Sequence, residues 1–150
     1  LSAQEHGDAR RALDLLRVAG ELAERKGARC VAVEHVHAAA RRIEHDRTVE
    51  AIRSLPLHAK LVLLATYELT KRASSATTGE IYAAYSAICS CLGLSPLTQR
   101  RISSIINELD TLGLLNAQLV NMGRYGRTKK IRLAVQRSLI RELLAEEGLM

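Results

Sequence analysis

The feature that most constrains this chain is an alternating strand that follows a basic, glycine-containing turn. In residues 129–135 (KKIRLAV), Ile131, Leu133 and Val135 alternate with charged or small residues. One face of such a strand can pack on a core while the other face keeps its charges in water. Residues 123–128 (GRYGRT) come just before and supply two glycines for a sharp turn. The two segments predict a β-hairpin with a cationic tip.

A helix is predicted immediately before this hairpin, over residues 95–112. Its apolar residues recur at the spacing of one helical face and are Ile102, Ile105, Ile106, Leu109 and Leu112. The opposite face carries Arg100, Ser103, Ser104 and Asn107. A helix followed by a basic hairpin predicts a winged helix-turn-helix that binds DNA.

Composition limits the fold and the cellular setting. The 150 residues suit one domain or two small ones, and the absence of Phe and Trp requires an aliphatic core. The abundance of Ala, Leu, Ile, Glu, Lys and Arg favours helices, so we expect mostly helix with one small sheet. No apolar run approaches a bilayer-spanning length. Cys30, Cys89 and Cys91 form no disulfide framework, so we expect a piece of a soluble protein from the reducing cytoplasm. The predicted DNA binding would associate this protein with the nucleoid.

Charge placement points to a polyanionic partner. The net charge is +6, and residues 124–132 hold five basic side chains and no acidic one. In the major groove, arginine can bridge guanine acceptors, asparagine can bridge adenine, and hydroxyls reach phosphates or base edges. The predicted DNA-binding residues are Arg100, Arg101, Ser103, Ser104, Asn107, Arg124, Tyr125, Arg127, Lys129, Lys130 and Arg132. Arg101 lies at the edge of the helix face, which suits a phosphate contact, and Arg124 or Arg127 can enter a minor groove.

The first part of the chain predicts three helices. The first opens at Gly7-Asp8, buries a face that includes Leu13 and Leu16, and stops at Gly27. The second carries Val36, Ala39, Ala40 and Ile43, and Asp46 is expected to cap a third. Because Pro56 should interrupt the chain, we place the domain boundary there, with residues 1–55 and 56–150 as the two units.

The second unit is predicted to be built around a helix over residues 57–70, which is apolar almost all round. Thr77 and Glu80 have capping-box spacing, and the helix that follows should end at Gly93 in a left-handed conformation. Ser95 and Pro96 are expected to begin the next helix. Leu114 to Asn121 alternates loosely and should pair with residues 129–135.

Metal and catalytic functions find little support in the sequence. His35 and His37 stand two apart on a predicted helix and point in different directions, and Cys89-Ser90-Cys91 lacks the spacing of a zinc site. No glycine-rich phosphate loop with its lysine is present, and no motif pairs a nucleophile with a base. We therefore expect no metal site and no catalytic residue in this chain.

A family resemblance covers nearly the whole chain. Residues 7–17 (GDARRALDLLR) resemble the second-sensor helix in the lid of AAA+ ATPases, specifically the archaeal initiators related to origin recognition complex subunit one and cell division control protein six. The stretches 33–42, 55–69, 97–115 and 124–133 are similar to that family in order and spacing. The resemblance implies a three-helix remnant of the lid, followed by a winged helix.

The resemblance also implies a function: an ATP-dependent replication initiator that binds double-stranded origin DNA. Its second-sensor arginine, which reaches nucleotide phosphates in the AAA+ core that precedes the lid, corresponds to Arg10, with Arg11 as the competing candidate. No cofactor is expected in this fragment, whereas ATP or ADP with magnesium is expected in the intact protein. Its implied partners are origin DNA, the AAA+ core of the same chain, other initiator subunits and the replicative helicase, with no membrane.

Two other interpretations of the second unit stay open at this point. A transcription regulator of winged-helix type would usually dimerise on a palindrome. A winged helix can also be a protein-interaction module that does not bind DNA.

Overall fold

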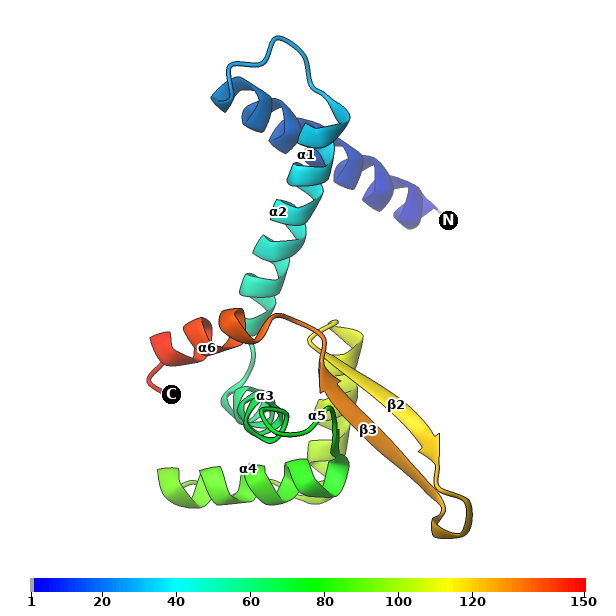
Figure 1. The fold of residues 1–150 in the computed structure, drawn as a ribbon, viewed down its shortest axis with the longest axis vertical. Helices are drawn as coiled ribbons and strands as arrows, with labels where there is room; N and C mark the ends of the chain where they lie inside the picture. The colour runs from blue at the N-terminus through cyan, green and yellow to red at the C-terminus, as the bar shows by residue number, and fades with distance from the viewer. Residues whose placement is uncertain (1) are drawn as a thin grey trace. The chain divides into compact units, whose positions relative to one another are not determined.

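The computed structural model describes the backbone of residues 2–150 and the side chains of residues 9–150 (Figure 1). The chain divides into two compact units, Leu1–Thr48 and Val49–Met150. Helices dominate both parts, and the strands form one small antiparallel sheet. The predicted fold class, mainly helical with a small sheet, is confirmed. In the described residues, no helix is long and apolar enough to span a membrane.

Two helices make up the first unit, and the end of the second helix belongs to the second unit. Helix α1 is Ser2–Arg25 and helix α2 is Val33–Arg53. The expected stop after α1 is present, because Gly27 has φ of 68° and the Ala28 amide donates to the Ala23 carbonyl at 2.9 Å. The expected start at Gly7 was wrong, since α1 already begins at Ser2.

The third helix predicted to begin at Asp46 does not exist as a separate element. Asp46 lies inside α2, which runs without interruption from Val33 to Arg53. No glycine or proline occurs between those two residues. An aspartate inside a helix is only mildly unfavourable, so the backbone ladder continues through it. The two-unit division falls within α2, and the boundary at residues 55 and 56 stays a prediction.

The buried face of α1 also differs from the predicted one. Leu13 and Leu16 of the predicted face are 67% and 60% exposed, whereas Ala23 of the same face is buried together with Ala19. Apolar residues cover more than half of the circumference of α1. Periodicity alone therefore could not determine which arc of this helix would be covered.

The second unit is built around helix α3, Leu57–Leu69, in which every residue from Ala59 to Tyr67 is buried. Pro56 precedes this helix and separates it from α2, as predicted. Helices α4 (Thr78–Leu92), α5 (Gln99–Thr111) and α6 (Arg137–Glu146) surround α3 (Figure 1). The aliphatic core expected from the composition therefore forms around this helix.

The sheet has three antiparallel strands: β1 (Ala76–Thr77), β2 (Leu115–Asn121) and β3 (Arg127–Leu133). The strand order is β1-β3-β2, so β3 is central. The β2–β3 hairpin was predicted, whereas no strand was predicted at Ala76. A segment of two residues is too short to show an alternation of apolar and polar side chains. It is a strand only because Ala76 pairs with Ile131.

The turn between α4 and α5 is glycine-dependent, as predicted. Gly93 ends α4 with φ of 68°, and the Leu94 amide donates to the Cys89 carbonyl at 2.8 Å. The expected start of α5 at Ser95 and Pro96 was wrong. Thr98 is the N-cap, and its hydroxyl accepts a hydrogen bond from the Arg101 amide at 3.2 Å.

Candidate nucleic-acid interface

Helix α5 presents a polar face to solvent because its apolar side chains anchor it to the core. Ile102, Ile105, Ile106 and Leu109 are buried at the spacing of one helical face. Arg100, Ser104 and Asn107 are exposed, and Ser103 is half-buried. Four of the predicted base-reading residues thus occur on an accessible surface of one helix.

A partly buried hydrogen-bond network holds the segment that leads into α5. The Tyr85 hydroxyl accepts a hydrogen bond from the Leu97 amide at 2.9 Å and lies 2.7 Å from Nδ1 of His58. The Tyr82 hydroxyl donates to the Leu97 carbonyl at 3.1 Å. Both polar groups of the Leu97 backbone therefore have partners, which fixes the start of α5 against α3 and α4.

The hairpin tip is a tight turn that needs glycine. A short 3₁₀ helix, Gly123–Tyr125, joins the strands, and the Met122 amide donates to the Gly126 carbonyl at 2.7 Å. Gly126 has φ of 81° and ψ of −154°, a conformation open essentially to glycine alone. The turn leaves Arg124 exposed and Tyr125 88% exposed at the tip.

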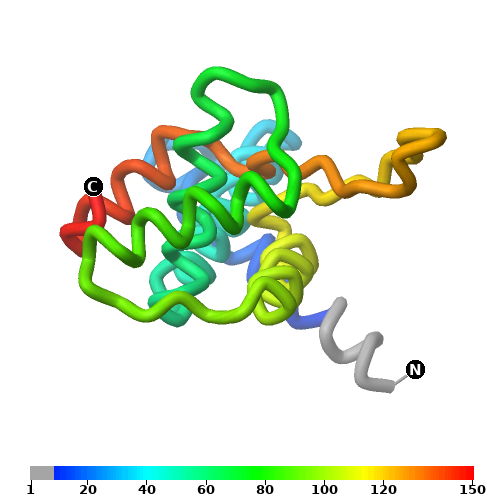
Figure 2. Tube along the Cα trace, turned by 90° about the horizontal axis from the view of Figure 1, so that it is seen from below, coloured from blue at the N-terminus to red at the C-terminus, as the bar shows by residue number. Residues whose placement is uncertain are grey.

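Helix α5 and the hairpin are joined by a direct contact. The ammonium of Lys129 donates to Oδ1 of Asn107 at 2.7 Å, linking the central strand to the polar face of the helix. A cavity of about 340 Å³ lies between α5 and the hairpin, and its lining includes Ser103, Leu119 and Arg127. Figures 1 and 2 show the hairpin extending from the helical core beside α5. The helix and the hairpin thus lie side by side on one surface of the second unit.

The hairpin divides its basic residues between two faces. Successive side chains of a strand point to opposite faces, and Lys129, which contacts α5, alternates with the exposed Lys130 and Arg132. Arg127 has the same parity as Lys129 and lines the cavity beside α5. The structure therefore gathers Arg127 and Lys129 beside the helix and places Lys130 and Arg132 on the other face.

Arg101 is set apart from the other basic residues. It lies 3.4 Å from a Glu108 carboxylate oxygen, on the same helix. Both side chains are more than half exposed, so this ion pair is weak and open to water. Arg101 therefore shares its exposed surface with an acidic side chain.

Sequence reasoning missed Thr78, which lines the cavity between α5 and the hairpin. The capping box at Thr77 and Glu80 marks Thr78 as the first residue of a helix, and the Thr77 hydroxyl does accept from the Glu80 amide at 3.2 Å. Nothing in that local pattern indicates that this helix start lies beside the hairpin. The pairing of β1 with β3 brings it there.

Arg10, the predicted nucleotide-contacting residue, is exposed on α1. The side chain of His6, a histidine for which no metal-ligand pattern was expected, lies outside the described side chains. Among the side chains that are described, no group of three histidine, cysteine, aspartate or glutamate residues is placed to hold a metal ion.

A helix-turn-helix whose second helix lies beside a two-stranded hairpin, with a third short strand completing the sheet, defines a winged helix domain. Comparison with protein families agrees with this class. The model of the CDC6 C-terminal winged helix domain matches residues 50–143. The model of the Cdc6 AAA+ ATPase-type lid domain matches residues 1–41. The chain therefore belongs to the ORC1/Cdc6 family of DNA replication proteins, as its sequence predicted.

Archaeal relatives share about half of the residues. The ORC1-type DNA replication protein of Thermococcus kodakarensis is 54% identical over 95% of this chain, which spans 35% of that relative. The ORC1-type DNA replication protein 1 of Archaeoglobus fulgidus is 48% identical over 98% of this chain and is covered to 36%. The chain thus spans about a third of the length of these relatives.

Solved structures show the same arrangement of elements. The Aeropyrum pernix ORC1 protein in complex with DNA matches 99% of this chain with a TM-score of 0.85 and 51% identity, and 39% of that chain is covered. A chain of Drosophila ORC bound to DNA matches 92% of this chain with a TM-score of 0.60 and 26% identity, and 35% of it is covered.

Proposed function

We propose that residues 49–150 bind double-stranded DNA through α5 and the hairpin, as the C-terminal part of an ATP-dependent replication initiator. The Lys129–Asn107 contact is the observation that carries this proposal, because it joins the helix and the hairpin on one surface. A major groove admits a helix, and a neighbouring basic hairpin can reach the adjoining backbone or minor groove. The ORC1 relative solved in complex with DNA supports the same assignment.

The two elements have different roles in this proposal. Arg100, Ser103, Ser104 and Asn107 on α5 contact base edges and nearby phosphates, with Arg101 on a phosphate at the edge. Arg124, Tyr125 and Arg127 reach the groove or backbone beside the helix, and Lys129 contributes from the strand. Lys130 and Arg132 add positive potential from the opposite face of the hairpin rather than the same contacts.

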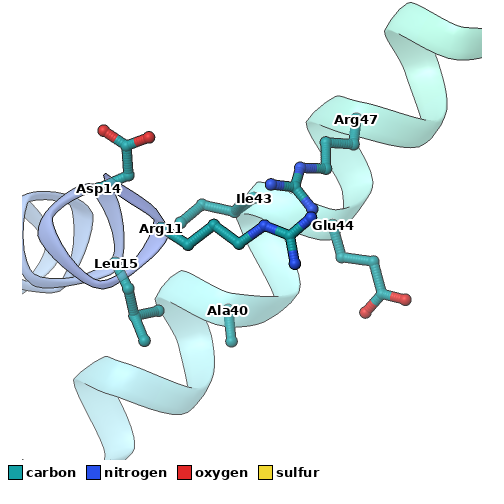
Figure 3. A pocket seen from close by; sticks show the side chains of 7 residues that line it. All are labelled: Arg11, Asp14, Leu15, Ala40, Ile43, Glu44 and Arg47. Atoms are coloured by element: carbon teal, nitrogen blue, oxygen red, sulfur yellow. The ribbon is translucent and has the colours of Figure 1, made fainter. Parts of the chain in front are cut away.

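Arg10 is proposed to contact the nucleotide in the intact protein. Arg10 and Arg11 are both exposed on α1, and Arg11 also lines a cavity beside α2 (Figure 3). The contact is assigned to Arg10 because Arg10 corresponds to the second-sensor arginine of the family, with Arg11 as the alternative. When bound by the intact protein, ATP or ADP would supply phosphate oxygens, for which a guanidinium is a suitable donor. Other initiator subunits and the replicative helicase are further proposed partners of that protein.

The DNA contacts are tested by measuring affinity and sequence preference separately. Fluorescence anisotropy with a labelled duplex at several salt concentrations gives affinity and salt slope, and selection from a random duplex pool gives preference. Arg124→Ala and Arg127→Ala should weaken binding to all sequences and each lower the salt slope by about one. Arg100→Ala and Asn107→Ala should relax the preference, each costing about 1–3 kcal/mol on the preferred site.

Arg141→Ala is the matched control, because it also removes one exposed arginine. Arg141 lies on α6, which is away from the hairpin in Figures 1 and 2. The Arg141→Ala variant should bind the duplex with the affinity and the sequence preference of the wild type. Unchanged affinity and preference in all four interface variants would refute the assignment. A protein-interaction module would show no duplex binding at any salt concentration, and a regulator of transcription would bind a palindrome as a dimer.

A further inference from the structure

The first unit contains a cavity that the proposed DNA interface does not use. It has a volume of about 340 Å³ and lies between α1 and α2 (Figure 3). Its apolar lining is Leu15, Ala40 and Ile43. Its charged lining is Arg11, Asp14, Glu44 and Arg47. All seven residues belong to the unit Leu1–Thr48.

The two arginines of this cavity come from different helices and converge. In Figure 3 the guanidinium groups of Arg11 on α1 and Arg47 on α2 point toward one another. Asp14 and Glu44 turn their carboxylates away from this pair in the same view. Among the side chains that the structure describes, the ion pairs within 4.0 Å involve other residues, so no described carboxylate pairs with Arg11 or Arg47.

Two converging guanidinium groups form a site that favours an anion. Arginine stays charged at all physiological pH values, so the pair repels unless a negative group lies between its members. Phosphate oxygens match the planar fork of guanidinium donors, and two forks can hold one phosphate from two sides. The apolar lining provides contact for an uncharged part of the same ligand, and the volume is in the range of small-molecule sites.

We propose that the cavity between α1 and α2 binds a phosphate group through Arg11 and Arg47. The phosphate is carried either by a small phosphorylated molecule, whose uncharged part rests on Leu15, Ala40 and Ile43, or by a DNA backbone. This site is separate from the proposed role of Arg10. Neighbouring residues on a helix are about 100° apart around its axis, so the side chains of Arg10 and Arg11 leave α1 in different directions.

The proposal is tested on the whole 150-residue chain by NMR of the arginine Nε–H groups. Pyrophosphate is titrated at constant ionic strength, with sodium chloride as the matched salt. The signals of Arg11 and Arg47, identified by their loss in Arg11→Gln and Arg47→Gln, should shift and saturate together. Each of these substitutions should weaken pyrophosphate binding about tenfold or more, because each removes charge-assisted hydrogen bonds.

Arg41→Gln is the control, since it neutralises an exposed arginine of α2 that does not line the cavity. It should leave pyrophosphate binding within about twofold of the wild type. A second titration with a short duplex of random sequence identifies the source of the phosphate. Shifts of Arg11 and Arg47 with the duplex indicate a DNA backbone, and shifts with pyrophosphate alone indicate a small ligand.

The wild-type titrations decide the proposal, and the variants are needed only to identify the two signals. If neither pyrophosphate nor the duplex shifts these two signals to saturation, the cavity binds no phosphate. Equal, non-saturating shifts of all arginines would also overturn the proposal, because they report only screening by salt. Neither result affects the DNA interface on α5, which is tested by other residues.

Discussion

Tyr85 shows how one side chain positions the proposed DNA-reading helix. It is fully buried in α4, yet its hydroxyl contacts the Leu97 amide before α5 and the His58 ring on α3. The His58 and Tyr85 rings also meet edge to face, with centroids 5.9 Å apart. Three elements of the second unit therefore depend on a single polar atom, which is costly to leave without partners in an apolar core.

Removing this hydroxyl should destabilise the chain. Tyr85→Phe leaves the Leu97 amide without its partner, at a cost of about 1–3 kcal/mol in the free energy of unfolding. Tyr82→Phe is the matched control, because it removes only one bond to the Leu97 carbonyl from a partly exposed ring. Urea denaturation at neutral pH measures both. A cost for Tyr85→Phe no greater than that for Tyr82→Phe would contradict this role.

The same residue predicts a pH dependence. Burial raises the pKa of Tyr85 above its usual value of 10.0, although the Leu97 hydrogen bond opposes the shift. The folded state therefore holds the phenolic proton more tightly than the unfolded state. This contribution is complete below pH 10.0 and is lost as the pH rises through the folded-state pKa. The difference in the free energy of unfolding between wild type and Tyr85→Phe should shrink as the pH rises above 10.0. A difference that stays constant would refute the linkage.

At the scale of elements, the hairpin depends on backbone geometry as much as on charge. Its strands are held by the register from Leu115 opposite Leu133 to Asn121 opposite Arg127. Arg124 lies in the turn beyond the last of these pairs, and the turn leads directly into Arg127. Gly126 makes that turn possible, because its φ and ψ values are strained for any residue with a Cβ.

Gly126→Ala should therefore disturb the tip while leaving the core intact. A Cβ at this position meets no atom within 4 Å, so the expected cost of about 1–3 kcal/mol comes from backbone strain alone. We expect faster hydrogen exchange at the Met122 amide, which the turn protects, and weaker duplex binding. Gly79→Ala in the first turn of α4 is the control, since its φ is unstrained and its Cβ has open space. Equal exchange and binding in the two variants would argue against a fixed tip.

At the scale of the whole molecule, the last residues of the chain secure the junction between α2 and α3. The Lys60 ammonium donates to the Arg53 carbonyl at the end of α2 and to a Glu147 carboxylate oxygen just after α6. Its side chain is only 10% exposed. A second pair joins Arg53 to Glu146 at 3.1 Å, in a more exposed position. The C-terminal helix thus holds the end of the long helix that enters from the first unit.

These two ion pairs should differ in strength. Glu147→Gln leaves the Lys60 charge buried without a counter-ion, which should cost about 1–3 kcal/mol in the free energy of unfolding. Glu146→Gln breaks an exposed pair and should cost less than about 1 kcal/mol. Urea denaturation of the full chain checks both values. Equal costs would show that burial of Lys60 does not strengthen its pairing.

Local patterns in the sequence determined most of the elements of this protein. Helix α3, the capping box at Thr77, the left-handed Gly93 and the basic hairpin each follow from residues that contact one another within a few positions. The family assignment rested on the resemblance of residues 7–17 and of four later stretches, and it is confirmed. Backbone hydrogen bonding and steric limits act over such short ranges, so they can be inferred before any tertiary contact is known.

Only the tertiary structure decided what depends on segments far apart in the chain. The exposed arc of α1, the strand at Ala76, the place of Thr78 beside the hairpin and the convergence of Arg11 with Arg47 have no local signal. Nor could periodicity show that Asn107 contacts Lys129. Such facts depend on which surfaces meet when the core forms, and many surfaces of similar composition could satisfy the same sequence pattern.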